Sequence, residues 1–168
     1  MPDPTFEDLF RSARRSAVHL EMRDGYMLDE DFRQWQAGTR FDPAERWRPW
    51  FDLMRDTTGR GVVVRRARIV SEPVTEYIRY EYDVTAGHNI AAGEQVRWLP
   101  RRRASDLALP GNDFWLLDGE AVLFNHFAGN GDMLGEEYVT DPSVAELCAT
   151  AFEAVWDRAV PHADYVPR

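Results

Sequence analysis

Lysine is missing from this sequence, and cysteine is nearly so. All 20 basic residues are arginine, which excludes mechanisms that use a lysine Schiff base or a lysine ammonium group. The single cysteine, Cys148, cannot form an internal disulfide, and this favours a reducing compartment. No apolar run approaches the ~20 residues of a membrane-spanning helix, and the N-terminus has no basic leader. We therefore expect a cytoplasmic protein.

Positive charge is also scarce relative to negative charge. The 168 residues carry a formal net charge of -9, with an isoelectric point near 4.9. Such a surface repels phosphate backbones and anionic lipids, so we expect no direct nucleic-acid or membrane binding. Hydrophobic residues make up 44% of the chain, which is enough for one domain of this length to bury a core.

The first part of the chain, residues 1–60, is predicted to be mainly helical. Helix-capping residues precede three amphipathic stretches, at Thr5, Asp29 and Asp42. Between the first two lies a short alternating strand with a charged face, "AVHLEMRD". The second and third helices carry an aromatic stripe that we expect to lie in the core: Phe32, Trp35, Trp47, Trp50 and Phe51.

Residues 61–168 are predicted to form an α/β sheet portion. A β-branched run, "VVVRRARIV", is typical of a covered strand, and a helix is expected to follow from Pro73. Further strands are expected at "EQVRWL", at a hairpin turning on Asp118-Gly119, and at "DMLGEEYV", before a closing helix from Pro142. The whole chain, 1–168, is thus predicted to be a single α/β (α+β) domain with a mixed β-sheet flanked by helices.

The element order from Gly61 to His162 resembles one half of the phospholipase D-like fold, which also occurs in effector domains of some bacterial regulators. In that superfamily a His-x-Lys pair precedes an aspartate of the same strand, with histidine as nucleophile and lysine as phosphate ligand. Placing the aspartate at Asp118 puts Asp113 at the lysine position and Gly111 at the histidine position. Because both groups are missing, phospholipase or nuclease activity of that type is not expected.

A second resemblance covers nearly the whole chain. The phrases "SAVHLEMRD", "RRARIVSEPVTEYIRYE", "GEQVRWLPRRR", "LPGNDFWLLDG" and "FNHFAGNG" resemble an actinobacterial domain-of-unknown-function family. Members of that family are often found beside helix-turn-helix regulators. The resemblance implies a regulatory setting and carries over no catalytic residues.

Polar residues near the expected strand ends form a candidate ligand-binding site. Ligands of open α/β sheets bind where strand ends meet, and the polar groups expected there are Glu72, Tyr77, Arg97, Arg101, Asn112, Asp113, Asn125 and His126. The arginines would clamp a small polar ligand or an acidic peptide. Alternatively, Asn112 and Asp113 cap a turn and the arginines pair with surface carboxylates. An Asp113→Ala change distinguishes the two, since capping predicts a loss of stability and a site predicts a loss of binding.

Two chemical roles are considered for the histidines. His126 is a candidate general base oriented by Asp113, because imidazole titrates near neutrality. His19 and Glu21 have strand spacing suited to a metal, but no further ligand lies at a suitable spacing. We therefore expect no metal site and no cofactor.

These observations favour a non-catalytic regulatory or interaction module acting with a separate helix-turn-helix DNA-binding protein, with a small polar ligand as a possible effector. The alternative is a small enzyme of a bacterial biosynthetic or hydrolytic pathway built on Asp113, His126 and the arginines. A homodimer is compatible with either interpretation.

Overall fold

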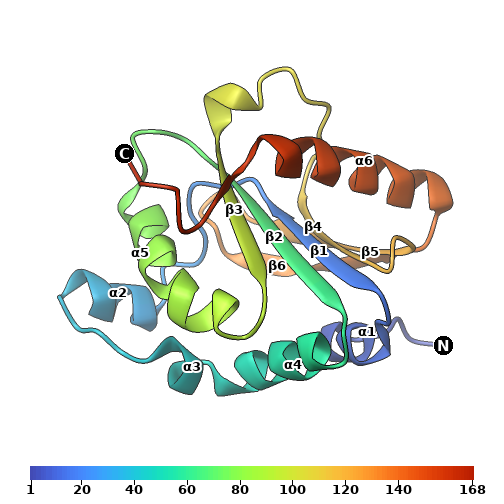
Figure 1. Cartoon of the computed structure of the whole chain (residues 1–168), viewed down its shortest axis with the longest axis horizontal. Helices are drawn as coiled ribbons and strands as arrows, with labels where there is room; N and C mark the ends of the chain where they lie inside the picture. The colour runs from blue at the N-terminus through green and yellow to red at the C-terminus, as the bar shows by residue number, and fades with distance from the viewer.

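The computed structural model describes residues Met1–Arg168 as a mixed seven-stranded β-sheet between two layers of helices (Figure 1). The strands lie in the order β6-β5-β4-β1-β2-β3-β7. Their bounds are β1 Ser16–Glu21, β2 Val63–Val70, β3 Gln95–Pro100, β4 Asp113–Leu117, β5 Ala121–Phe127, β6 Met133–Val139 and β7 Val160–Pro161. The helices are α1 Phe6–Ser12, α2 Glu30–Gln36, α3 Pro43–Arg46, α4 Arg48–Gly59, α5 Glu76–Thr85, π-helix η1 Ala86–Ile90, 3-10 helix η2 Arg101–Arg103 and α6 Pro142–Arg158.

The central strand of the sheet comes from the first 60 residues. Strand β1 pairs in parallel with β2 and antiparallel with β4, and β2 pairs in parallel with β3. The two parallel connections contain α2 to α4 and α5, and because such crossovers are right-handed, both place their helices on the same face of the sheet. Helix α6 packs on the opposite face (Figure 1).

Alternation along the strands divides the core between the two faces. On the α6 face, a cluster of 15 buried residues includes Leu20, Ile69, Phe114 and Phe152. On the other face, one apolar cluster packs under α1 and α4, and a separate one packs under α5. Strand β2 runs from the cluster under α1 and α4, which contains Val64, to the cluster under α5, which contains Val70. The two residues between them on that face, Arg66 and Arg68, are buried and charged.

The predicted fold class is confirmed, with local differences at element ends. The helix expected from Pro73 begins at Glu76, because the Thr75 side chain caps it by accepting from the Ile78 N–H. The single helix expected from Asp42 is divided at Trp47, whose backbone leaves the helical conformation, and α4 begins anew at Arg48 with Pro49 in its first turn. The hairpin turn is confirmed, and both Asp118 and Gly119 have positive φ.

Candidate functional site

The eight residues expected at one site are distributed over both faces of the sheet. Arg97 lies on the α6 face, where it donates to the Trp156 carbonyl at 3.0 Å and stacks on the Trp156 ring. Asn112 is exposed, and Glu72 is half-buried. Tyr77, a residue of α5, lies on the opposite face, where it contacts Phe32 of α2. The structure therefore does not gather these eight side chains into one pocket.

Asp113 and His126 are also separated by the sheet. Asp113 lies opposite Asn125 in the β4–β5 register, and both are buried on the face that carries α4 and α5. His126, one residue further along β5, points to the other face, and its Nε2 lies 3.0 Å from Glu137 Oε2. The expected orientation of His126 by Asp113 is therefore wrong.

A group of polar side chains does meet at the strand ends, as expected, but its members bind one another. The Arg101 guanidinium donates to the Met22 carbonyl and to the Ser71 hydroxyl, and it lies 3.4 Å from Asp24. Asp113 accepts from the Met22 N–H at 2.9 Å and from the Tyr26 hydroxyl. These contacts hold the ends of β1, β2 and β3 and the start of β4 together. The polar side chains therefore have a structural role.

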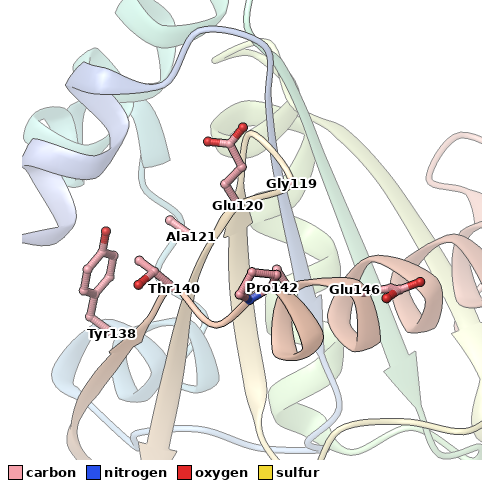
Figure 2. Close-up of a pocket in the computed structure, with 8 residues that line it drawn as sticks. Gly119, Glu120, Ala121, Tyr138, Thr140, Pro142 and Glu146 are labelled. Atoms are coloured by element: carbon pink, nitrogen blue, oxygen red, sulfur yellow. The ribbon is translucent and has the colours of Figure 1, made fainter.

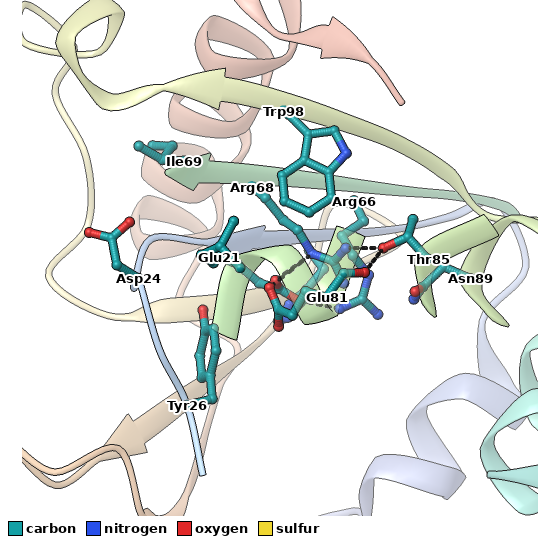
Figure 3. A network of polar contacts seen from close by, with 12 residues as sticks. Glu21, Asp24, Tyr26, Arg66, Arg68, Ile69, Glu81, Thr85, Asn89 and Trp98 are labelled. Atoms are coloured by element: carbon teal, nitrogen blue, oxygen red, sulfur yellow. Dashed lines mark hydrogen bonds and ion pairs between the residues drawn. The ribbon is translucent and has the colours of Figure 1, made fainter. Parts of the chain in front are cut away.

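The buried polar side chains between the two apolar clusters form a network centred on Glu21 (Figure 3). Glu21 accepts from Arg66 through Oε1 and from the Arg68 Nε through Oε2, the latter at 2.8 Å. Arg66 also pairs with Glu94 at 3.1 Å, and the Arg68 Nη1 donates to the Thr85 hydroxyl at 2.6 Å. Burial alone would raise the pKa of Glu21, but the two guanidinium groups hold it well below its ordinary value.

His19 completes the network without offering a metal site. Its Nδ1 lies 2.8 Å from the Phe114 carbonyl, its ring stacks on Trp115, and its Nε2 lies 3.3 Å from Glu21. Both Glu21 oxygens are already bound by arginines. No group of three or more His, Cys, Asp or Glu side chains in the chain is placed to hold a metal ion.

A cavity of about 440 Å³ opens beside this network, between the sheet, α4 and α5. Arg66, Arg68 and Glu21 form its floor, and aromatic side chains form much of its wall: Trp47, Trp50, Tyr77 and Tyr80. The aromatic stripe was expected in the core, and Phe51 is indeed buried there. Trp47 and Trp50, however, face the cavity.

Glu81 of α5 brings a carboxyl group into the cavity without a hydrogen-bond partner. Its Oε2 is buried and unpaired, and its side chain is 12% exposed. The nearest guanidinium atom, the Arg68 Nε, lies 3.8 Å away and already donates to Glu21. Burial therefore outweighs the attraction of Arg68 and raises the pKa of Glu81 to about 8.

His88 is the second group in the cavity with an unpaired buried atom. It lies on the π-helix η1, an element frequently found at functional sites, between the rings of Trp47 and Trp50 at 4.8 and 4.5 Å. Its Nε2 is buried without a partner. Burial, assisted by Arg66 and Arg68, lowers the pKa of His88 to about 3, so the ring is neutral at physiological pH.

Sequence comparison assigns the chain to a family. Residues 4–167 match the model of a family described as a domain of unknown function, DUF6879. This chain belongs to the DUF6879 family. Comparison with curated proteins finds no match. The expected resemblance to a domain-of-unknown-function family is confirmed, while the actinobacterial origin and the neighbouring regulators remain predictions.

The DUF6879 domain is similar in fold to a phospholipase D family member. Nuc from Salmonella typhimurium shares 12% identity with a TM-score of 0.53, over 92% of this chain and 86% of Nuc. TrmBL2, an archaeal chromatin protein, shares 13% identity with a TM-score of 0.48, and the match covers 92% of this chain but 47% of TrmBL2. At these identities the likeness concerns the fold alone.

Asp118, which was placed at the aspartate position of the phospholipase D-like motif, has a structural role in the DUF6879 domain. Its carboxylate accepts from the backbone N–H groups of Arg14, Arg15 and Ser16. These backbone contacts lower the pKa of Asp118 in spite of its partial burial. The carboxylate therefore fixes the start of β1 to the hairpin turn.

A second cavity, of about 450 Å³, lies beside that turn and the start of α6. Its polar side chains include Glu120, Tyr138 and Glu146, which spread around the opening and do not converge on one point (Figure 2). We therefore take the cavity at Glu81 and His88 as the candidate site. None of the helices is long and apolar enough to cross a membrane.

Most residues of this site were not among those expected from the sequence. The alternation of arginines in "RRARIV" was visible, but a strand covered on both faces was not expected to bury two of them. Only Tyr77 of the expected residues lines the cavity. The spacing of Tyr77, Glu81 and Val84, which places them on one face of α5, was the available signal.

Proposed function

We propose that the DUF6879 domain is a non-catalytic regulatory module that binds a small molecule in the cavity between α4 and α5. A separate helix-turn-helix protein would carry the DNA-binding activity. The observation that supports ligand binding is the pair of buried polar atoms, Glu81 Oε2 and His88 Nε2, that lack partners within the chain and line the same cavity. Buried polar groups are rarely left unpaired, because each costs about 1 to 3 kcal/mol.

The size and lining of the cavity also support this proposal. Its volume falls within the ~300 to 1,000 Å³ of ordinary small-molecule sites, and it combines aromatic walls with a few polar groups. The floor is rigidly held, since both arginines are paired and stacked on Trp50, Trp98 or Trp115. A site held in this way is preorganised for binding.

A non-catalytic role is favoured because no serine, threonine, cysteine or lysine side chain lines the cavity. The only cysteine, Cys148, is buried on the α6 face, and the nearby Thr85 hydroxyl donates to the Glu81 carbonyl. The alternative enzyme was built on Asp113 and His126, which point to opposite faces of the sheet.

Ligand binding is tested by thermal unfolding with a panel of small molecules from three classes: organic cations, neutral heteroaromatics and carboxylates. A ligand that binds only the folded state raises the unfolding temperature. Val84 lines the cavity, so Val84→Phe should fill it and remove the response. Leu147→Phe, on the exposed side of α6, is the matched control and should retain it. A response that survives in Val84→Phe would contradict this location.

The partner proposal is tested separately. The chain alone should not retard duplex DNA at physiological salt, because its net charge is -9. Co-expression with a helix-turn-helix protein encoded beside it should yield a complex on size-exclusion chromatography. Salt-sensitive DNA binding by the chain alone, or separate elution of the two proteins, would contradict the proposal.

A further inference from the structure

We propose that the ligand of this cavity is a small organic cation, a quaternary or protonated amine, held by the aromatic walls and by the Glu81 carboxylate. This inference rests on the proposed function and specifies its ligand class. The chemistry that carries it is the combination of an unpaired buried carboxyl oxygen with the aromatic side chains of Trp47, Trp50, Tyr77 and Tyr80 around one space.

The two arginines of the cavity, Arg66 and Arg68, do not donate a hydrogen bond to Glu81 Oε2. Arg66 is bound by Glu21 and Glu94, and Arg68 is bound by Glu21 and Thr85. The Arg68 Nε also lies 3.8 Å from Glu81 Oε2, beyond hydrogen-bond distance, but it donates to Glu21. Glu81 therefore has only a shared counter-charge, and a cation entering the cavity would supply one of its own. The aromatic faces add to this, because a cation over Trp or Tyr gains about 0.5 to 2 kcal/mol.

An anionic ligand is disfavoured by the same arrangement. Three carboxyl groups line the cavity, Glu21, Asp29 and Glu81, against two arginines. Glu21 engages both arginines, so an anion would have to displace a buried carboxylate from them. The loss of such a buried pair costs more than a new ion pair returns.

Binding of a cation should be linked to the ionisation of Glu81. At physiological pH the carboxyl is mostly protonated, since its pKa is about 8, and a fixed positive charge would favour the carboxylate. The other titratable or charged groups facing Glu81 or the cavity come from β1, β2, β4, η1, α5 and the segments before α2: Glu21, Arg66, Arg68, Asp113, His88, Tyr26, Asp29, Tyr77 and Tyr80. His88 stays neutral above about pH 4, which leaves Glu81 as the group that titrates near pH 8.

The test uses choline and its neutral isostere, in which carbon replaces the ammonium nitrogen, titrated into the full chain by calorimetry. The charge of choline does not change with pH, so any pH dependence belongs to the protein. We expect choline to bind at least about tenfold more tightly than the isostere near pH 9, and its affinity to fall by up to about tenfold per pH unit below pH 8.

Two variants identify the carboxyl group that responds. Glu81→Gln should lower choline affinity at least about tenfold near pH 9 and abolish the pH dependence, while the isostere binds as before. Glu120→Gln is the matched control, because Glu120 lies in the hairpin turn with its side chain 76% exposed, and it should leave both affinities unchanged. Circular dichroism establishes that Glu81→Gln is folded.

The outcomes separate this inference from the function on which it rests. Equal binding of choline and isostere, or a pH dependence retained in Glu81→Gln, overturns the cationic ligand class and leaves the cavity as a binding site. If neutral heteroaromatics or carboxylates from the panel bind and choline does not, the cationic ligand class is likewise overturned and the cavity remains a binding site. If no compound of any class binds, the proposed function and the inference both fail.

Discussion

Replacing Glu81 by glutamine should stabilise the domain at neutral and alkaline pH, which is unusual for a change at a buried polar residue. The carboxyl group is buried, its Oε2 has no hydrogen-bond partner, and the nearest guanidinium is bound to Glu21. An ionised carboxylate would therefore lie desolvated, with the shared Arg68 Nε at 3.8 Å as its nearest positive charge. Glutamine has nearly the same shape and no charge, so it removes this cost.

The size of the stabilisation expected for Glu81→Gln follows from the proton that the Glu81 carboxyl retains in the folded state. The pKa of Glu81 rises from an ordinary 4.5 to about 8 in the folded chain, so between these values the folded state holds a proton that the unfolded state releases. Each pH unit in that window lowers the free energy of unfolding by about 1.4 kcal/mol. At pH 7 the accumulated loss is about 3 kcal/mol, and below about pH 4.5 it vanishes.

Urea denaturation of the wild-type chain and of Glu81→Gln, at several pH values from about 4 to 9, measures this difference directly. The two free energies of unfolding should agree near pH 4 and diverge as pH rises, with the variant more stable. A variant that is less stable at pH 8 would refute the reasoning, because it would mean that the ionised Glu81 stabilises Arg68.

Three further substitutions test the structural roles assigned above. Glu21→Gln should lower the free energy of unfolding by about 3 to 5 kcal/mol, because it leaves Arg66 and Arg68 short of a buried counter-charge; a loss under about 1 kcal/mol in urea denaturation would contradict this. Asp113→Ala should cost about 1 to 3 kcal/mol, since it strands the Met22 N–H and the Tyr26 hydroxyl, whereas unchanged thermal stability would restore the ligand-binding role expected from the sequence. Gly93→Ala should be destabilising, because the new Cβ would lie 2.5 Å from Thr58 Oγ1 at a backbone φ of +102°, and an unchanged melting temperature would argue against that backbone geometry.

Much of the fold could be predicted from local sequence signals. Thr5, Asp29 and Asp42 cap helices as expected, because a short polar side chain before an amphipathic run satisfies the first free N–H groups. The hairpin was predictable because Asp118-Gly119 supplies two residues that tolerate positive φ. The central position of β1 was not predictable, since its pairing with β2 and β4 depends on contacts distant in sequence.

The site was harder to predict than the fold, because charge patterns on strands do not reveal what covers them. His19 and Glu21 had the alternation of a solvated face, yet helices cover that face. Glu21 pairs with Arg66 and Arg68 of β2, and His19 lies against Glu21. Asp113 and Arg101 were correctly expected at strand ends, but their partners come from the β1 end, so they join the strands and do not face a pocket. The role of Glu81 depends on a missing partner, which only three-dimensional packing shows.

The account rests most directly on ligand binding at the cavity between α4 and α5. Titration with choline, followed through the indole N–H resonances of the six tryptophans, reports on both faces of the sheet at once. The resonances of Trp47 and Trp50, which line the cavity, should shift, and that of Trp156, a buried residue of α6 on the far face, should not. Shifts confined to Trp156, or no shift at Trp47 and Trp50, would contradict the binding of an organic cation in this cavity.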